Sequence, residues 1–278
     1  MARWSSLSEE SAPIRVLTFT GSLVFSLFRS GRGVVETVAQ MLLFLAESAA
    51  WFFRPPVRFG QFARQLDFVG AQSVMLIVLT GAFTGMVSAL QGYIGMSKYG
   101  AQSMVGATVA LALTRELGPV ISALMVVGRV GSAMTAELGS MRNTQQIDAL
   151  ESMAVNSIQY LVVPRIFAST VVMPVLALIF SLAGMVGAYL ISTQYLGVDA
   201  GMFMSGVQYY LDPDDVSHGA VKAAVFGLIT SVVACYKGYY ATGGAGGVGI
   251  ATTRSVVLSS VLVLISDYVM TNLMFHRT

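Results

Sequence analysis

The sequence has few charged residues for its length. Only 11% of its 278 residues are Asp, Glu, Lys or Arg, whereas 55% are hydrophobic. A typical soluble domain has roughly 25% charged residues, and a soluble fold of this size could not cover its apolar core with so few. The composition therefore indicates a protein whose solvent is a lipid bilayer.

Several kinds of site are also missing. A single cysteine, Cys235, excludes an internal disulfide, and the two histidines, His218 and His276, are too far apart in sequence to suggest a metal site. A net charge of +2 without a basic run argues against a nucleic-acid partner. No G-x-x-x-x-G-K-[ST] motif occurs, so we expect no cofactor on this chain and no ATPase activity of its own.

One nucleotide-binding pattern is present without its context. Residues 244–249 satisfy G-x-G-x-x-G, but that fingerprint needs a strand before it and a helix after it. Here both flanks are apolar stretches long enough to cross a membrane. We interpret these glycines as a flexible cytoplasmic turn.

Long apolar stretches are what the sequence does have. A membrane-spanning helix needs roughly 20 such residues, and five stretches qualify: 68–91, 104–136, 161–192, 219–242 and 255–275. The second and third exceed 30 residues, which implies tilt, kinks at Pro119 and Pro174, or extension beyond the bilayer. The predicted fold class is an all-α integral membrane protein with about five transmembrane helices.

A sixth apolar segment, Val34–Phe53, is ambiguous. Its polar residues Glu36, Gln40 and Glu47 share one stripe of a helix whose remainder is apolar. This pattern is typical of an amphipathic helix in the headgroup plane, and we favour such an interfacial helix. The alternative is a first span with a polar seam facing its neighbours.

The distribution of Lys and Arg predicts the orientation. Residues 1–66 contain seven arginines, whereas the loop 195–218 has no Lys or Arg. That loop carries four acidic residues: Asp199, Asp212, Asp214 and Asp215. Because positive residues stay on the cytoplasmic side, we expect a cytoplasmic N-terminal segment, 1–66, followed by a membrane domain, 67–278, whose C-terminus lies outside.

Two loop segments are predicted to be helical. Asn143–Gln146 resembles a capping box, and an amphipathic helix on the cytoplasmic face would follow it. The apolar side of that helix holds Ile147, Leu150 and Ala154, and its polar side holds Asp148 and Glu151. In residues 199–211, the apolar stripe of Phe203, Val207 and Tyr210 predicts a helix on the outer surface.

Charged residues inside the apolar stretches are candidate functional residues. A charge at bilayer depth costs on the order of 2.5–3.5 kcal/mol, so it needs a partner, a water-filled cavity or a polar ligand. Arg115 and Glu116 point about 100° apart on a helix, so we expect each to have another partner. We predict a lipid-pathway role for them with Gln91 and Tyr93, and leave a purely structural role open. For Asp267 in the last stretch we favour a structural role.

Small residues predict close helix packing. Gly81-xxx-Gly85 fits the pattern of a helix dimerisation face, and residues 128–136 give the second stretch a smooth surface.

From about residue 60 onward, the chain resembles the MlaE permease family, the membrane subunits of MCE-associated ABC transporters. The stretches that carry the resemblance are Leu90-Gln91-Gly92-Tyr93, Arg115-Glu116-Leu117-Gly118-Pro119-Val120, Gly128-Arg129-Val130-Gly131-Ser132-Ala133, Thr135-Ala136-Glu137-Leu138-Gly139-Ser140-Met141, Gln146-Ile147-Asp148-Ala149-Leu150, Leu161-Val162-Val163-Pro164-Arg165 and Ala251-Thr252-Thr253-Arg254. Gln145 departs from the glutamate usual in the family, and Asn156-Ser157 replaces a common Asp-Pro.

The resemblance implies a homodimeric permease in the bacterial inner membrane. It implies as partners a cytoplasmic ABC ATPase dimer, which binds the ATP and Mg, and a periplasmic ring of MCE-domain subunits. The implied function is to move phospholipid between inner and outer membranes, which maintains outer-membrane lipid asymmetry. It also implies that the helix near 144–154 is the coupling helix that docks into the ATPase.

Two other functions remain open. An ion-coupled secondary transporter would use Glu116 or Asp267 to bind protons, although we find none of the internal repeats typical of such proteins. A scaffold without transport would use the same charges only to hold helices together. The cargo could also be another lipid, such as a sterol.

Overall fold

The structure, a computed structural model, describes residues 36–52 and 59–275. The chain divides into two compact units, Met1–Glu47 and Ser48–Thr278. A helix covers residues 36–52, within the segment predicted to be an interfacial helix, and the ends of that segment lie outside the described residues. So do six of the seven N-terminal arginines, all except Arg64.

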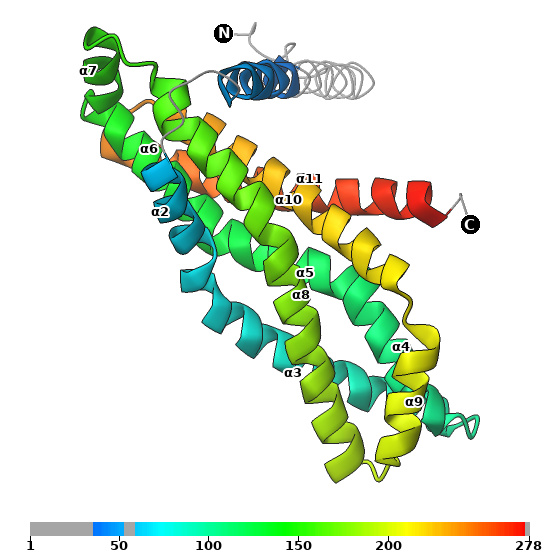
Figure 1. Cartoon of the computed structure of the whole chain (residues 1–278). Helices are drawn as coiled ribbons and strands as arrows, with labels where there is room; N and C mark the ends of the chain where they lie inside the picture. Colours follow the sequence, from blue (N-terminus) through cyan, green and yellow to red (C-terminus); the bar gives the residue numbers. More distant parts are fainter. Residues whose placement is uncertain (1–35, 53–58, 276–278) are drawn as a thin grey trace, which may run out of the picture. The chain divides into compact units, whose positions relative to one another are not determined.

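The second unit is built from helices, and its described residues contain no strand (Figure 1). The elements in chain order are α2 (Phe59–Val69), η1 (Ala71–Ser73), α3 (Val74–Ser97), η2 (Gln102–Met104), α4 (Val105–Ala112), η3 (Leu113–Leu117), α5 (Gly118–Val126), η4 (Val127–Gly131), α6 (Ser132–Asn143), α7 (Gln146–Ser152), η5 (Ile158–Val162), α8 (Val163–Gln194), α9 (Ala200–Tyr210), α10 (Pro213–Tyr239) and α11 (Gly244–Phe275).

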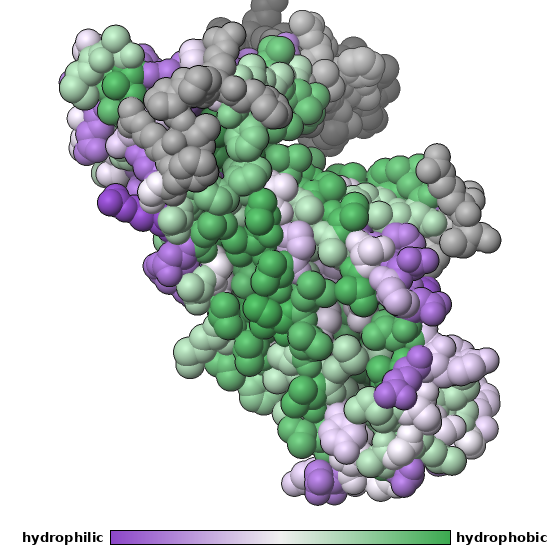
Figure 2. Space-filling model, viewed as in Figure 1, coloured by the Kyte–Doolittle hydropathy of each residue, from purple (hydrophilic) through white to green (hydrophobic). Residues whose placement is uncertain are grey.

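Five helical segments of the described part are long and apolar enough to cross a membrane: Gly60–Ser97, Gln102–Asn143, Ile158–Gln194, Pro213–Tyr239 and Gly244–Met274. They confirm the predicted all-α membrane fold and its five spans. Most boundaries lie outside the predicted ones, because helical hydrogen bonding continues into polar flanks that a hydropathy pattern leaves out. The surface agrees: apolar side chains dominate the middle of the visible face, and hydrophilic ones gather near α7 (Figure 2).

The second span is a helix interrupted by two π-helical turns, η3 and η4. Pro119 lies two residues after the end of η3, in the first turn of α5. A proline lacks a backbone N–H, and the wide π turn lies where the regular ladder would need one. The interruption predicted at Pro119 is thus a local change of helix type. Pro174 lies inside the uninterrupted helix α8.

Glycines bring α3 and α8 into close contact. A Cβ on Gly81 would lie 2.6 Å from the carbonyl oxygen of Phe180, and a Cβ on Gly85 would overlap the backbone of Gly184. The predicted close packing is confirmed. Both glycines are buried against a helix of their own chain, however, so the dimerisation face suggested by their spacing is wrong.

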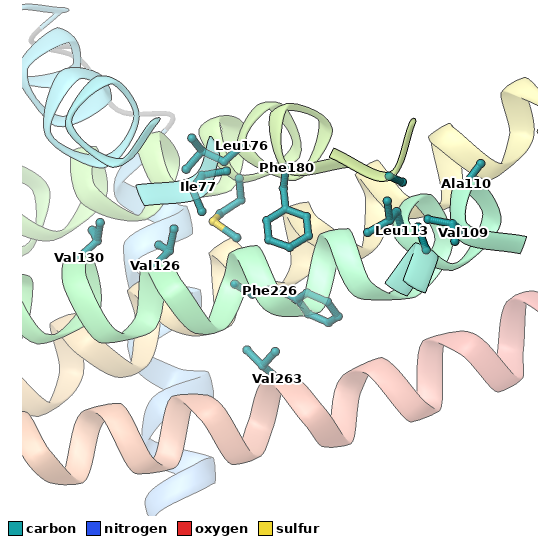
Figure 3. Close-up of a cluster of buried hydrophobic side chains, with 14 of the residues drawn as sticks. Ile77, Val109, Ala110, Leu113, Val126, Val130, Leu176, Phe180, Phe226 and Val263 are labelled. Carbon is teal, nitrogen blue, oxygen red and sulfur yellow. The ribbon is translucent and has the colours of Figure 1, made fainter. Parts of the chain in front are cut away.

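The hydrophobic core lies where α3, α8 and α10 meet the second span (Figure 3). Phe180 from α8 and Phe226 from α10 are fully buried there, and Ile77 and Leu113 pack into the same cluster. Val263 joins it from α11. The core thus ties all five spans together.

The two predicted loop helices both exist, with different boundaries. α9 begins after Asp199, whose carboxylate accepts a hydrogen bond from the backbone N–H of Met202 at 2.9 Å. Of the predicted apolar stripe, Phe203 and Val207 are buried, whereas Tyr210 is 43% exposed.

The predicted capping box before α7 is wrong. Asn143 is still part of α6, and α7 begins after Gln145, which adopts a left-handed conformation with φ 58° and caps nothing with its side chain. The helix ends at Ser152, so Ala154 lies beyond it. The glycine-rich segment 244–249 is likewise not a turn, because α11 already begins at Gly244.

Candidate functional site

The centre of the candidate site is Lys222, a residue that the sequence analysis did not single out. It lies nine residues into α10, about 14 Å from the start of that helix. Lys222 as a whole is 1% exposed. A buried ammonium at this depth is costly unless acceptors surround it. The neighbouring helices therefore have to supply them.

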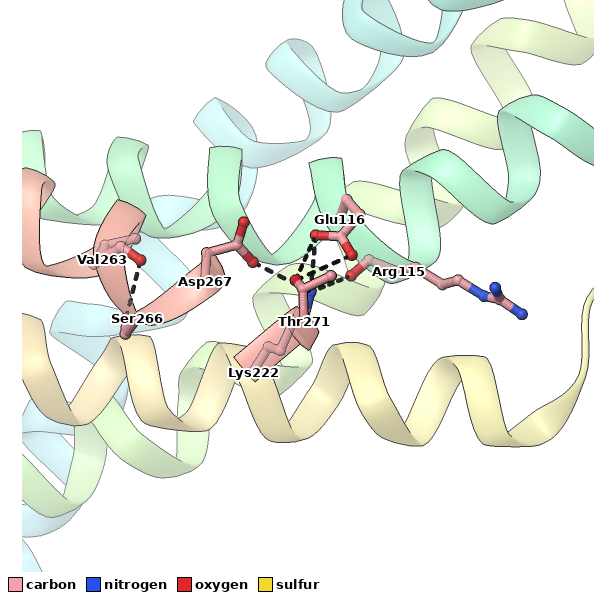
Figure 4. Close-up of polar contacts among 7 residues, drawn as sticks. All are labelled: Arg115, Glu116, Lys222, Val263, Ser266, Asp267 and Thr271. Carbon is pink, nitrogen blue, oxygen red and sulfur yellow. Dashed lines mark hydrogen bonds and ion pairs between the residues drawn. The ribbon is translucent and has the colours of Figure 1, made fainter. Parts of the chain in front are cut away.

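Two carboxylates from different spans provide the counter-charges (Figure 4). The Lys222 ammonium lies 2.8 Å from Oε2 of Glu116, in η3, and 3.2 Å from Oδ1 of Asp267, in α11. It also donates to the hydroxyl of Thr271 at 2.6 Å, and it lies 3.3 Å from the backbone carbonyl oxygen of Arg115. Thr271 in turn lies 3.3 Å from both carboxylate oxygens of Glu116.

This arrangement has more acceptors than protons. An ammonium has three N–H donors, and four acceptors surround Lys222. Two negative charges face one positive charge, so the ionised trio of Glu116, Lys222 and Asp267 carries a net charge of −1. The carboxylates therefore have acceptor capacity that Lys222 alone does not use.

The network is open on the side of its carboxylates. The Lys222 side chain is 2% exposed, whereas those of Asp267 and Glu116 are 21% and 37% exposed. Bare carboxylates do not face hydrocarbon at bilayer depth. Their exposed side therefore belongs to a water-filled cavity, a polar ligand or another protein surface.

Arg115 forms a second ion pair next to this network. Its Nε lies 2.6 Å from Oδ1 of Asp215, whose side chain is 5% exposed. The other oxygen of Asp215 accepts the backbone N–H of Asp212 at 3.1 Å, at the start of α10. The expectation that Arg115 and Glu116 have different partners is confirmed.

Gln91 and Tyr93 were predicted to line a pathway with Arg115 and Glu116. Gln91 is exposed on α3, and Tyr93 packs against the edge of the hydrophobic core. Within the described residues, no hydrogen bond joins either of them to the charged network. Asp267 is paired with Lys222, so it belongs to the same network as Glu116.

The residues predicted to form the coupling helix are divided between buried and exposed positions. Ile147 is fully buried in its own chain, and Leu150 is partly buried. Asp148 forms an exposed ion pair with Arg142 at 2.6 Å. Glu151 and Ala154 are exposed. Ile147 is therefore not available to an incoming partner.

The family of the chain can be decided by comparison. The sequence model described as Permease MlaE matches residues 62–273, which is most of the chain and all of the charged network. The chain belongs to the MlaE permease family. The resemblance carried by its sequence motifs is thereby confirmed.

Named proteins of several organisms resemble this chain. A "Probable ABC transporter permease protein" of Rickettsia bellii is 43% identical over 242 residues, 87% of this chain and 93% of the relative. The "Intermembrane phospholipid transport system permease protein MlaE" of Haemophilus influenzae is 40% identical over 225 residues, 80% of this chain and 86% of the relative. "Protein TRIGALACTOSYLDIACYLGLYCEROL 1, chloroplastic" of Arabidopsis thaliana is 38% identical over 213 residues, 77% of this chain and 61% of the relative.

Proposed function

We propose that this chain is the membrane-spanning permease subunit of an ABC transporter that moves phospholipid between the inner and outer membranes of a bacterium. Family membership and the name of the Haemophilus relative support the transporter class and the cargo. The proposed partners are a second copy of the chain, a cytoplasmic ATPase dimer and a periplasmic ring of MCE-domain subunits. The proposed location is the inner membrane, with the N-terminus in the cytoplasm.

The observation that carries the proposal is the open charged network inside the spans. Glu116 and Asp267 are partly exposed at a depth where only a cavity, a ligand or another chain can cover them. A phospholipid crossing between two copies needs apolar walls for its tails and a few polar groups for its headgroup. We assign Glu116, Asp267 and Arg115 to that polar part, with Gln91 and Tyr93 nearer the outer end of α3.

The proposed contact with the ATPase is α7 and the residues after it. Because Ile147 is buried, the docking surface consists of the exposed side of this segment. Met153 is its most exposed large apolar residue, at 65%. A methionine of this kind adapts to the groove of a partner protein. Met153→Asp should separate the permease from the ATPase, whereas Ile147→Asp should unfold the segment.

Reconstitution with the partner ATPase tests the function. Vesicles that contain the complex should transfer phospholipid to acceptor vesicles only with ATP. Glu116→Gln keeps the shape of the side chain and removes its charge, and Glu116→Leu also removes its polarity. We expect both variants to assemble and both to transfer less lipid, with leucine the slower.

Asp214→Asn is the matched control, because Asp214 is an exposed residue on the outer side of the network. Its lipid transfer should equal that of the unmodified chain. Normal transfer by both Glu116 variants would place the lipid path elsewhere. Transfer driven by a proton gradient without ATP would instead support the ion-coupled transporter, for which the sharing of Lys222 by two carboxylates is the favourable observation.

A further inference from the structure

A second polar cluster lies at the end of the helices next to α7, remote from the charged network. The hydroxyl groups of Ser157 and Tyr239 are 2.7 Å apart. Both reach the same carboxylate oxygen, Oε1 of Glu151, at 2.8 Å from Ser157 and 3.1 Å from Tyr239. We call these three residues the Glu151 triangle.

The triangle is built to hold its members together. Ser157 is 3% exposed and Tyr239 is 8% exposed, so their hydroxyl groups have lost most of their water. The carboxylate of Glu151 offers only acceptors, and each hydroxyl has one proton to donate. Hydrogen bonds to a charged acceptor are stronger than those between neutral groups. Glu151 itself is exposed, so loss of one hydroxyl would remove a direct link between it and the buried Ser157 and Tyr239 without unfolding the helices.

The triangle links α7 to α10, which is far from it in sequence, and not only to its sequence neighbour α6. Glu151 lies in α7, whose helix packing is against α6. Ser157 lies just before η5, and Tyr239 is the last residue of α10. The hydrogen bond from Tyr239 to Glu151 thus joins the proposed docking segment directly to a membrane span.

Strained residues bound the docking segment on both sides. Gln145, before α7, and Ala154, after it, have φ angles of 58° and 57°. This left-handed conformation is unfavourable for a residue with a Cβ, and such positions persist where the surrounding structure holds them. The segment between them is therefore a short unit set off by two held backbone positions, with the triangle as its tether.

The helix at the other end of the tether carries Lys222. Tyr239 and Lys222 are 17 residues apart on α10, which is about 26 Å along the helix axis. Near Tyr239, a Cβ on Gly238 would lie 2.8 Å from both the Cβ of Leu138 and the backbone oxygen of Thr135. The half of α10 that carries Tyr239 thus packs closely against α6, so a displacement at Tyr239 would be carried along the rigid helix toward Lys222.

We propose that the Glu151 triangle is the positioning contact that transmits movement of the ATPase-bound segment to α10 and thereby to the network around Lys222. This inference rests on the proposed function, since it takes α7 to be the docking element. Glu151, Ser157 and Tyr239 are positioning residues that touch neither nucleotide nor lipid. Their loss uncouples ATP hydrolysis from lipid movement.

The test uses variants that each lack one hydroxyl group. Each variant is assembled with the partner ATPase, and the complex is reconstituted in phospholipid vesicles. Tyr239→Phe and Ser157→Ala each remove one hydroxyl of the triangle. The matched controls are Tyr195→Phe, exposed at the opposite end of the protein, and Ser152→Ala, whose hydroxyl bonds only within its own helix. Two rates are measured for each variant: ATP hydrolysis and lipid transfer.

For Tyr239→Phe and Ser157→Ala we expect complexes that co-purify normally and hydrolyse ATP at a rate close to that of the unmodified complex. Lipid transferred per ATP should fall about fivefold, within the range of coupling changes caused by single substitutions. Both control variants should keep the original ratio. A merely structural role would lower the two rates together and leave their ratio unchanged, which would overturn the proposal.

Other outcomes separate this proposal from the one on which it rests. If the unmodified complex transfers no lipid with ATP, the proposed function fails. If it does transfer lipid and both triangle variants keep its ratio, only the triangle proposal fails. If Tyr239→Phe does not assemble, the smaller change Ser157→Ala decides, and failure of both to assemble overturns the proposal by making the triangle a structural contact.

Discussion

Two helix contacts within the bundle are built in opposite ways. Along α3 and α8, glycines bring backbones together, and a Cβ on Gly81, Gly85 or Gly187 would strike the facing main chain. Where η3, α10 and α11 meet, the carboxylates of Glu116 in η3 and Asp267 in α11 pair with Lys222 in α10. The first contact holds through van der Waals packing, and the second holds through hydrogen bonds and charge.

This difference in packing distinguishes the contact that stabilises the fold from the network that can respond to a ligand. Close backbone packing has one good arrangement, because atoms in a dense interior cannot shift without overlap or voids. In the charged network, four acceptors surround the three N–H donors of Lys222, so its hydrogen bonds can be distributed among them in more than one way. We infer that the α3–α8 contact is a fixed support and that the network beside it is the adaptable part.

The largest effect is expected from a methyl group in the glycine contact. In Gly85→Ala the new Cβ would overlap the backbone of Gly184, and the two helices would have to separate. We expect a loss of about 3 kcal/mol of stability, measured by thermal unfolding in detergent. Gly95→Ala is the control, because a Cβ at this position of the same helix meets no atom within 4 Å. Equal stability of the two variants would mean that α3 and α8 are not so closely packed.

A smaller loss is expected when the network loses its cation. Lys222→Met fills the same space but leaves Glu116 and Asp267 facing each other. Breaking a buried ion pair typically costs 3–5 kcal/mol; partial exposure of both carboxylates should reduce this to about 2 kcal/mol. The same unfolding assay measures it.

Removing the carboxylates as well should reverse that loss. The triple variant Lys222→Met, Glu116→Gln and Asp267→Asn contains no unpaired charge, so it should recover most of the stability. It should not recover lipid transfer. No difference between the single and triple variants would show that the charges do not interact.

The sequence predicts the fold well because the bilayer imposes a simple rule. Every spanning segment must satisfy its own backbone hydrogen bonds, so long apolar stretches become helices whatever they pack against. The amphipathic stripe with Phe203 and Val207 was equally informative, since both residues are buried where α9 packs on α4. Local patterns such as these depend on few distant contacts.

The candidate site is less predictable because its members come from distant parts of the chain. The free-energy cost of a charge inside the bilayer identifies Arg115 and Glu116 as candidates. It does not identify their partners, which lie 100 and 106 residues away in sequence. Lys222 carried the same signal as a lysine within the fourth apolar stretch, and a count of charges in every stretch would have found it.

Residues of a short amphipathic helix are ambiguous in a different way. Ile147 and Leu150 share an apolar face, but the pattern does not say whether that face meets another protein or the remainder of the chain. The structure buries Ile147 completely. Only the position of α6 shows which residues of this helix are buried and which are exposed.

A still smaller effect is expected at the outer ion pair. Asp215→Asn keeps an oxygen that can accept the N–H of Asp212 and removes the charge opposite Arg115. Arg115 is partly exposed, so we expect a loss of about 1 kcal/mol. Asp214→Asn, one residue away and exposed, should stay within about 0.5 kcal/mol of the unmodified chain. A loss as large as that of Lys222→Met would place the outer pair inside the same cooperative network.

The smallest effect should come from the hydroxyl at the centre of the network. Thr271→Val removes the acceptor that lies 2.6 Å from the Lys222 ammonium, but three acceptors remain for its three protons. Glu116 also keeps its bond to the lysine. Because no buried group is left without a partner, we expect a change below about 0.5 kcal/mol. A loss approaching that of Lys222→Met would mean that the network has no spare acceptor, and it would then be as rigid as the glycine contact beside it.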